Sequence, residues 1–561
     1  MKQESAVFLT VQLLFGPALL STWLMGPPAN PALAASRSKH VSTASVKTAK
    51  PSSNMASLGP VSAPKPMTSD QKVVQVLNRL TFGAKPGDFE RVKAMGVKAY
   101  IASQLNPSSI AENPAVEAQV ASAEIIHRKS ADLIKEFRLS IAQNNAARKA
   151  VNGKDGKEDA NQVEKNTLAS KEEQAMKQKH IKVVADQIFK TRLVRALDSE
   201  RQLQEVMVDF WYNHFNISIN KGLDHVLIGV YEEQAIRPNA LGRFRDILGA
   251  TCYHPAMLFY LDNWQNAAPG TLMVVPGGNT KDKAKKKGGL NENYARELME
   301  LHTLGVDGGY TQKDVIELAR VLTGLSLPYR GYWGQFYAVR HDQGEKVILG
   351  HKIAAKGAGE IEEALDFLAR HPSTAHHISY ALAQYFVADE PPKALVDRMA
   401  KRFSESDGDI KAVLTTMLES REFFDGQYQN NKYKSPFRYA MSALRASGSR
   451  PEHYEPIYSF LKLQGQPLYA CLTPDGYKNT KEAWLNSDAL LKRINFATAL
   501  GSAGNTGGNR AFSQASGQSY DQVLSTVNGG QLSSRTSAVI AKSPEPFKLA
   551  LLLGSPEFMS Y

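Results

Sequence analysis

The stretch Gly288 to Leu325 reads GGLNENYARELMELHTLGVDGGYTQKDVIELARVLTGL, and its pattern decides the fold of the chain around it. Apolar residues recur at helical spacing in two segments that glycines separate. Gly305 and the pair Gly308-Gly309 are expected to end the first helix and turn the chain. Thr311 and Asp314 have the spacing of a capping box for the second helix. The stretch therefore predicts a helical hairpin.

The first helix of this hairpin carries a histidine on its buried face. A wheel of 100° per residue places His302 beside Leu298 on the apolar arc, whereas Glu297 lies between the two faces. Glu297 and His302 are about 140° apart on that wheel, so they do not share an ion without ligands from elsewhere. We therefore assign no metal. The polar side of the hairpin supplies three candidate binding residues, which are Asn291, Arg296 and Arg320, and Asn213, outside the hairpin, is a fourth.

A second histidine follows the same pattern in the segment 192–214. His214 comes four residues after Phe210 and therefore lies on the same apolar face of the expected helix, next to Asn213. A buried imidazole needs a hydrogen-bond partner, which either a core or a site supplies. Both interpretations of His214 stay open from the sequence alone.

The strongest strand pattern lies at Tyr332 to Leu349. Here YWGQFYAV and KVIL flank the segment HDQGE, which predicts a β-hairpin with His341 and Asp342 at or near its turn. Elsewhere helical periodicity dominates. We therefore expect an all-α protein, with a large single domain and a small β-hairpin near 332–349.

The N-terminal residues have the pattern of an export signal. An apolar run ends before the small residues Ala32 and Ala34, which predicts a cleaved signal peptide over 1–34. An uncleaved membrane anchor is the alternative, because the run approaches spanning length. The following residues, 35–69, contain much Ser, Ala, Pro and Lys and no acidic residue, so we expect a disordered linker. The helical domain would then occupy 70–561.

Most of the net charge lies in two short segments. The chain has a formal charge of +12, of which the linker supplies +5 and the run 281–287 supplies +4. The remainder is close to neutral, so the composition does not indicate a nucleic-acid-binding face. We interpret the two segments as flexible basic tethers attracted to anionic surfaces of the cell envelope.

Two further features bear on the organisation of the domain. Residues 121–190 have high helix propensity but few apolar residues, which predicts a charged helical insertion. The two cysteines, Cys252 and Cys471, are a candidate disulfide for a chain that passes through an oxidising compartment. A pair of buried free thiols is the alternative, since Cys252 lies on an apolar stripe.

Several stretches together resemble one bacterial family. GLNENYARELMELHTLGVDGGYTQKDV is similar to the signature of the family known as domain of unknown function 1800. Other stretches extend the resemblance over most of 70–561, and they are LNRLTFGAKPGD (77–88), DFWYNHFNIS (209–218), LGRFRDILGATCYHPAMLFYLDNWQ (241–265), HDQGEKVILG (341–350), SPFRYAMSALRA (435–446), GQPLYACLTPDGY (465–477) and LLLGSPEF (551–558). The resemblance implies a large, mostly helical, exported bacterial protein. It supplies no established activity and no catalytic residue.

The sequence therefore supports two functional hypotheses. The favoured one is a periplasmic or extracellular binding or assembly protein of the cell envelope, whose partner is an envelope protein or polymer. Under this hypothesis we expect the protein to have no nucleic-acid partner and its mature chain to have no transmembrane segment. The alternative is an enzyme, hydrolytic or metal-assisted, whose catalytic candidates are His214, Glu297, His302, His341 and Asp342. The sequence indicates no particular cofactor.

Overall fold

The structure is a computed structural model that describes residues 65–152, 184–274, 285–451, 453–501, 512–514, 520–527 and 530–561. The chain from Pro64 to Tyr561 forms one compact unit. The predicted signal peptide, residues 35–64 of the predicted linker and the centre of the charged insertion lie outside the described residues. In the described part of the chain, no helix is long and apolar enough to cross a membrane.

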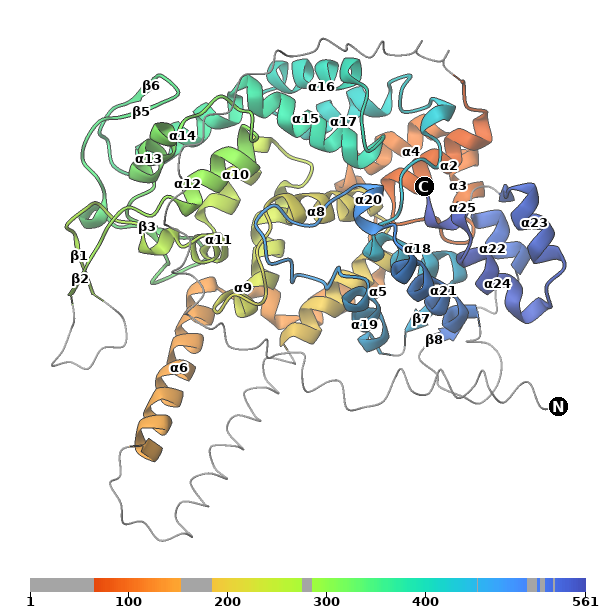
Figure 1. The fold of residues 1–561 in the computed structure, drawn as a ribbon, viewed down its shortest axis with the longest axis horizontal. Coiled ribbons are helices and arrows are strands. Elements are labelled where there is room, and N and C mark those ends of the chain that lie inside the picture. The colour runs from red at the N-terminus through yellow and green to blue at the C-terminus, as the bar shows by residue number, and fades with distance from the viewer. Residues whose placement is uncertain are drawn as a thin grey trace, which may run out of the picture. The chain divides into compact units, whose positions relative to one another are not determined.

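Helices make up most of the first half of the unit (Figure 1). They are α2 (Ser69–Leu80), α3 (Asp88–Met95), α4 (Val97–Gln104), α5 (Pro114–Ser122), α6 (Ser130–Asn152), the helical residues 184–198, α8 (Gln202–His214), α9 (Asp224–Tyr231), the π-helix η5 (Glu232–Ile236), α10 (Phe244–Tyr253), α11 (Pro255–Tyr260), α12 (Asn293–Glu297), the π-helix η8 (Leu298–Thr303) and α13 (Gln312–Val321). A buried aromatic cluster surrounds Trp211, whose indole nitrogen donates to the carbonyl of Ala240 at 2.9 Å.

The second half is also helical. It contains α14 (Gly359–Arg370), α15 (Pro372–Phe386), α16 (Lys393–Glu405), α17 (Ile410–Leu418), α18 (Pro436–Ser447), α19 (Glu455–Leu463), α20 (Lys481–Trp484), α21 (Ser487–Gly501), α22 (Tyr520–Thr526), α23 (Ser534–Ala541), α24 (Glu545–Leu553) and α25 (Pro556–Met559). Helix α15 packs against α16, α16 against α17, and α21 against α24. The all-α fold class predicted from the sequence is confirmed.

The predicted helical hairpin is present, with one change in its first helix. The capping box of Thr311 and Asp314 begins α13 as expected, and Gly305 and Gly309 have φ angles of +85° and +84°. Gly308 does not share this conformation, but a Cβ at this glycine would lie 2.4 Å from the Cβ of Leu304. The first helix is α-helical only as far as Glu297 and continues as a π-helix, so a wheel of 100° per residue does not apply beyond that residue.

The strands form small two-stranded antiparallel sheets. They pair β1 (Leu272–Val274) with β2 (Lys285–Lys287), β3 (Leu325–Ser326) with β4 (Gln335–Phe336), β5 (Lys346–Ile348) with β6 (His351–Ile353), and β7 (Ser449–Pro451) with β8 (Phe512–Gln514). A small hairpin near 332–349 is confirmed as β5 and β6, but the strand partners differ from those expected. Residues 335–336 pair with β3, so His341 and Asp342 precede the hairpin instead of forming its turn. Lys285–Lys287 also corrects a prediction, because these residues of the supposed tether are a strand.

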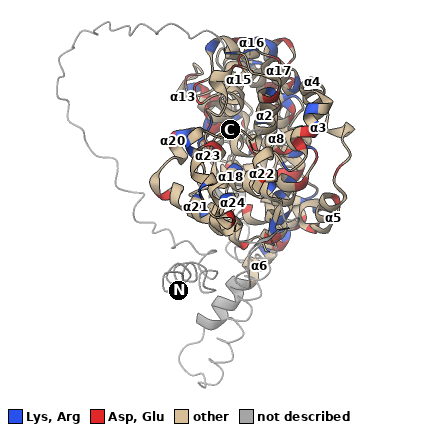
Figure 2. Cartoon of the chain, turned by 90° about the vertical axis from the view of Figure 1, so that its right-hand side faces the viewer, with Lys and Arg blue, Asp and Glu red and all other residues tan. Residues whose placement is uncertain are grey.

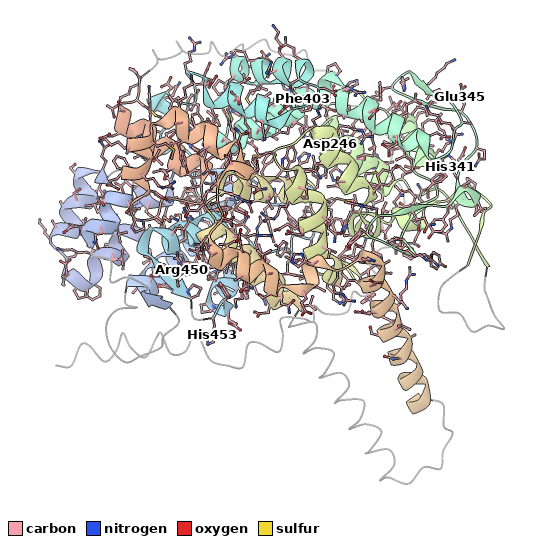
Figure 3. All side chains as sticks on the ribbon, turned by 180° about the vertical axis from the view of Figure 1, so that it is seen from behind. Asp246, His341, Glu345, Phe403, Arg450 and His453 are labelled. Carbon is pink, nitrogen blue, oxygen red and sulfur yellow. The ribbon has the colours of Figure 1, made fainter. Side chains whose placement is uncertain are left out.

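The surface charge agrees with the near-neutral remainder expected from the sequence. In the view of Figure 2, segments of Lys and Arg residues and of Asp and Glu residues are interspersed along the described chain. Helix α6, which begins the predicted insertion, packs against α9 near its start and extends away from the other helices in the views of Figures 1 and 3. The end of the insertion, at 184–190, is part of a helix with buried apolar residues.

Candidate functional site

Two histidines bind the end of the π-helix η8. His214 of α8 donates from Nε2 to the carbonyl oxygen of His302 at 3.1 Å, and His377 of α15 donates from Nδ1 to the carbonyl oxygen of Thr303 at 2.8 Å. Carbonyl groups at the end of a helix need partners from outside that helix. Two imidazoles supply them here, so the contacts connect α8, η8 and α15.

These contacts fix the tautomers of the two rings. A carbonyl oxygen only accepts, so Nε2 of His214 and Nδ1 of His377 carry the protons. The other nitrogen of each neutral ring, Nδ1 of His214 and Nε2 of His377, is then an acceptor. Burial lowers the pKa of His214 to about 3 and also lowers the pKa of His377. Both rings are therefore uncharged at neutral pH.

The structure places the rings of His214 and His302 near each other, whereas Glu297, the third residue of the hypothetical site, is not placed beside them. Their ring centroids are 6.3 Å apart, and the ring of His377 lies 5.9 Å from that of His214. His302 is buried, its Nε2 has no hydrogen-bond partner among the described residues, and burial lowers its pKa well below the usual value. Sequence reasoning missed His377. It could have been found from its spacing to Ala381 and Gln384, which places all three on one face of α15.

A cavity of about 320 Å³ lies beside this histidine cluster. His214, His377 and Asn213 line it, together with side chains from 184–198, α15, the start of α18 and the segment 466–479. Six aromatic rings contribute to its wall, and they are Phe210, Tyr212, Tyr385, Phe437, Tyr469 and Tyr477. The segment 466–479 has no regular helix or strand, so its place in the wall depends on long-range contacts.

Asn213 holds that segment against α8. Its Nδ2 donates to the carbonyl of Tyr477 at 2.9 Å, and its Oδ1 accepts from the amide of Tyr477 at 2.7 Å. Gly476 makes this approach possible. Its φ is +67°, and a Cβ at this position would lie 2.3 Å from the carbonyl oxygen of Asn213. Asn213 is therefore a structural part of the cavity wall, with both ends of its amide engaged by the backbone.

A buried network of charges lies under the cavity. Arg192 donates to Asp209 at 2.9 Å and to Glu232 of the π-helix η5 at 2.8 Å. The hydroxyl of Tyr469 also donates to Glu232, and that of Tyr385 donates to Asp209. Burial alone would lower the pKa of Arg192, but Glu232, Tyr469 and Asp209 outweigh burial and raise it. The guanidinium is therefore a fixed cation that connects its own helix to α8 and to η5.

The other catalytic candidates lie elsewhere. His341 is buried, with Nε2 3.1 Å from Glu360 and Nδ1 2.9 Å from the carbonyl oxygen of Thr323; Figure 3 labels its place. Asp342 forms two hydrogen bonds with Arg320, whose guanidinium also binds Glu317. These contacts hold the β5–β6 region in place. None of the residues that make them lines the cavity.

Three candidates from the helical hairpin also lie away from the histidine cluster. Glu297 lies near Glu300 and Asp475, and its pKa is raised first by burial and then by the charge of Glu300. Asn291 accepts from the amide of Asn293 at the start of α12. Arg296 donates to Glu292 and Gln312 at the surface. We place none of the three beside the imidazoles of the cluster.

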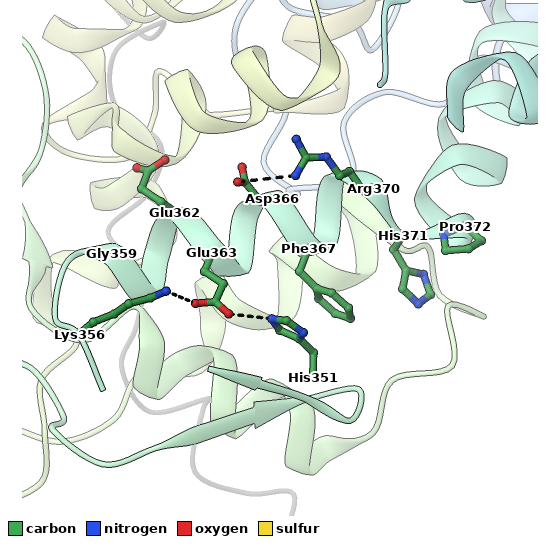
Figure 4. A pocket seen from close by; sticks show the side chains of 10 residues that line it. All are labelled: His351, Lys356, Gly359, Glu362, Glu363, Asp366, Phe367, Arg370, His371 and Pro372. Atoms are coloured by element: carbon green, nitrogen blue, oxygen red, sulfur yellow. Dashed lines mark hydrogen bonds and ion pairs between the residues drawn. The ribbon is translucent and has the colours of Figure 1, made fainter. Parts of the chain in front are cut away.

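A second hollow lies on the surface beside α14 (Figure 4). Its volume is about 650 Å³, and charged residues that bind one another form much of its lining. Glu363 contacts His351 and Lys356, and the ring of His351 stacks on Phe367 with centroids 4.7 Å apart. Arg245 binds both acidic groups on the other side of α14, Glu362 and Asp366. We interpret this hollow as a network that holds β6 and α10 to α14.

Cys252 and Cys471 do not form the disulfide considered from the sequence. Both are free and buried. Cys252 lies near the phenol of Tyr294, whereas Cys471 lies near the hydroxyl of Thr473. The alternative of two buried thiols agrees with the structure.

We expect both cysteines to react with iodoacetamide only after denaturation, whether or not reductant is present. Burial raises the pKa of Cys252 to about 12, so little of the reactive thiolate forms at neutral pH. Intact mass should show two additions in urea without reductant. A chain that gains these additions only after reduction would contain the disulfide.

The class that fold and site define is a mainly helical protein with an imidazole cluster beside a ligand-sized cavity. Within the described residues, no three His, Cys, Asp or Glu side chains form a group that could hold a metal ion. The chain belongs to the family "Protein of unknown function (DUF1800)", whose model matches residues 75–560. No match was found among curated proteins or among solved structures.

Proposed function

We propose that this chain is an exported binding protein that holds a small polar ligand in the cavity beside His214 and His377. Export is supported by the sequence alone, through the signal pattern at 1–34. The binding role is supported by the cavity. Its volume of about 320 Å³ lies at the lower end of the range for small-molecule sites.

The observation that carries the proposal is the composition of the cavity wall. Small-molecule sites combine apolar and aromatic surface with a few polar groups in fixed orientations. Here six aromatic rings share the wall with two imidazoles whose tautomers η8 fixes. Each of these rings has a second nitrogen to which the described residues supply no hydrogen bond, and a buried acceptor without a partner is costly in a packed core.

The test compares two neighbouring histidines of α15. His377→Gln keeps a donor for the carbonyl of Thr303 but replaces the ring acceptor Nε2 with an amide oxygen in a different position. His376→Gln is the matched control, because His376 is exposed and does not line the cavity. Small molecules that raise the melting temperature of the wild-type protein should lose that effect in His377→Gln and keep it in His376→Gln.

Two results would contradict the proposal. If no compound from a broad library of polar metabolites raises the melting temperature, the cavity is not a binding site. If every such compound stabilises His377→Gln as well as the wild type, the ligands bind elsewhere. Export is tested separately by sequencing the N-terminus of the secreted protein, which should start near Ala35.

A second candidate function, a hydrolytic enzyme, is favoured by one observation. Nε2 of His377 is unprotonated at neutral pH and belongs to a side chain of the wall, as a general base must be, whereas a pKa of about 3 makes His214 a weak base. Incubation of the protein with each stabilising compound, followed by mass spectrometry, separates the two functions. A binding protein returns the compound intact, whereas an enzyme converts it and loses this activity in His377→Gln.

A further inference from the structure

The charged groups of the cavity wall neutralise one another. Four charged side chains line the cavity, and they form the pairs Arg192–Asp209 at 2.9 Å and Lys478–Asp475 at 2.6 Å. The two imidazoles add no charge at neutral pH, because burial lowers the pKa of both. The described wall therefore offers no unpaired charge to a charged ligand, whose desolvation would be costly.

The wall does offer open hydrogen-bonding groups of both kinds. His214 and His377 present acceptor nitrogens, and Gln384, whose Nε2 is bound to the carbonyl of Asp389, has its Oε1 as an acceptor. Gln466 accepts from the amide of Phe437 through Oε1, so its Nε2 group remains a donor. A hydroxyl group both donates and accepts, so several hydroxyls on one ligand match this mixture.

The aromatic rings add apolar surface. The hydroxyls of the four tyrosines in the wall are engaged within the protein, with partners Ile217, Asp209, Glu232 and Pro467. What these rings present to a ligand is therefore mainly carbon. The wall contains amide and imidazole side chains as well as these rings.

We propose that the ligand of this cavity is an uncharged carbohydrate. This inference rests on the proposed binding function and names its ligand class. A sugar ring has two apolar C–H faces and a rim of hydroxyls, so it meets aromatic carbon and mixed donors and acceptors at once. An organic acid, an amine or a phosphate would bring a charge that the paired residues of the wall do not balance.

The test titrates the full-length protein with sugars that differ in charge. Glucose, N-acetylglucosamine and cellobiose are the uncharged probes, and glucosamine and glucuronate are the charged ones. By isothermal titration calorimetry we expect at least one uncharged sugar to bind, and the charged sugars to bind about tenfold or more weakly. Binding of glucosamine or glucuronate as tight as that of every uncharged probe would overturn the inference, and so would the absence of sugar binding.

A variant tests the same inference through the wall itself. Gln466→Glu keeps an acceptor for the amide of Phe437 but replaces the open donor with a negative charge. We expect this variant to bind the uncharged sugar about tenfold more weakly than the wild type does. We also expect the affinity for glucosamine to rise relative to that for glucose. Gln335→Glu, at an exposed position on β4, is the matched control and should leave both affinities unchanged. Thermal melts of both variants show whether each is folded.

The outcomes separate this inference from the proposed function. If compounds other than sugars bind in a manner that depends on His377, the carbohydrate assignment is wrong and the binding function stands. If no compound of any class binds in that manner, both fail. An uncharged sugar whose affinity does not change in either Gln466→Glu or His377→Gln binds outside the cavity, which also overturns the inference.

Discussion

Replacing Arg192 with methionine is expected to lower the free energy of unfolding by roughly 3–5 kcal/mol, because it leaves buried carboxylates without their cation. Arg192 is almost fully buried and binds both Asp209 and Glu232. Glu232 retains Tyr469 and a longer contact with Arg237 at 3.4 Å, which compensates only in part. Urea denaturation followed by circular dichroism measures the loss.

A second arginine provides the control for this variant. Arg243 binds Asp407 at 2.7 Å, but its side chain is 57% exposed, so Arg243→Met should cost less than about 1 kcal/mol. The double variant Arg192→Met/Glu232→Gln should lose less stability than the two single changes added together, because it removes a carboxylate that Arg192 no longer neutralises. Equal losses for Arg192→Met and Arg243→Met would mean that the buried network does not stabilise the fold.

The sequence was sufficient for the fold class and for part of the site. The capping box of Thr311 and Asp314 depends on residues three positions apart, so local pattern alone identifies it. His214 and His302 were recognised because each replaces an apolar residue on a buried stripe, and the structure brings their rings to 6.3 Å. Local periodicity indicates which residues face the interior, and both histidines face it.

The remaining wall of the site depends on contacts that periodicity does not report. Tyr469 and Tyr477 belong to a segment without regular structure, and Asn213 positions it from more than 250 residues away in sequence. The π-helix also changes the angular step after Glu297, and neighbouring segments decide where such a turn forms. His341 and Asp342 resembled site residues because they are polar and adjacent, yet their partners are Glu360 and Arg320.

Acidification is expected to destabilise the protein because two buried histidines and the partly exposed His214 must stay uncharged. Burial lowers the pKa of His214 and His254 to about 3 and that of His302 well below its usual value of 6.5. The unfolded chain takes up these protons near pH 6.5, whereas the folded chain does not. Stability is therefore fully present above pH 6.5 and is lost as the pH falls from 6.5 toward 3. Each histidine contributes a slope of at most about 1.4 kcal/mol per pH unit.

Three such groups give a combined loss of up to about 4 kcal/mol per pH unit below pH 6, or about 6 kcal/mol by pH 5, which is comparable to the lower end of the usual stability of a domain. Urea denaturation at pH 7, 6 and 5 measures the slope. His254→Asn should reduce the slope by the contribution of one histidine, because asparagine does not titrate. The variant should still fold, because asparagine retains the cap that His254 provides to the amide of Ala256. His302→Phe should reduce the slope equally, at a cost of no more than about 1 kcal/mol at pH 7, since the Nε2 of His302 has no partner to lose. A slope that neither variant changes would show that both imidazoles titrate alike in the folded and unfolded chains.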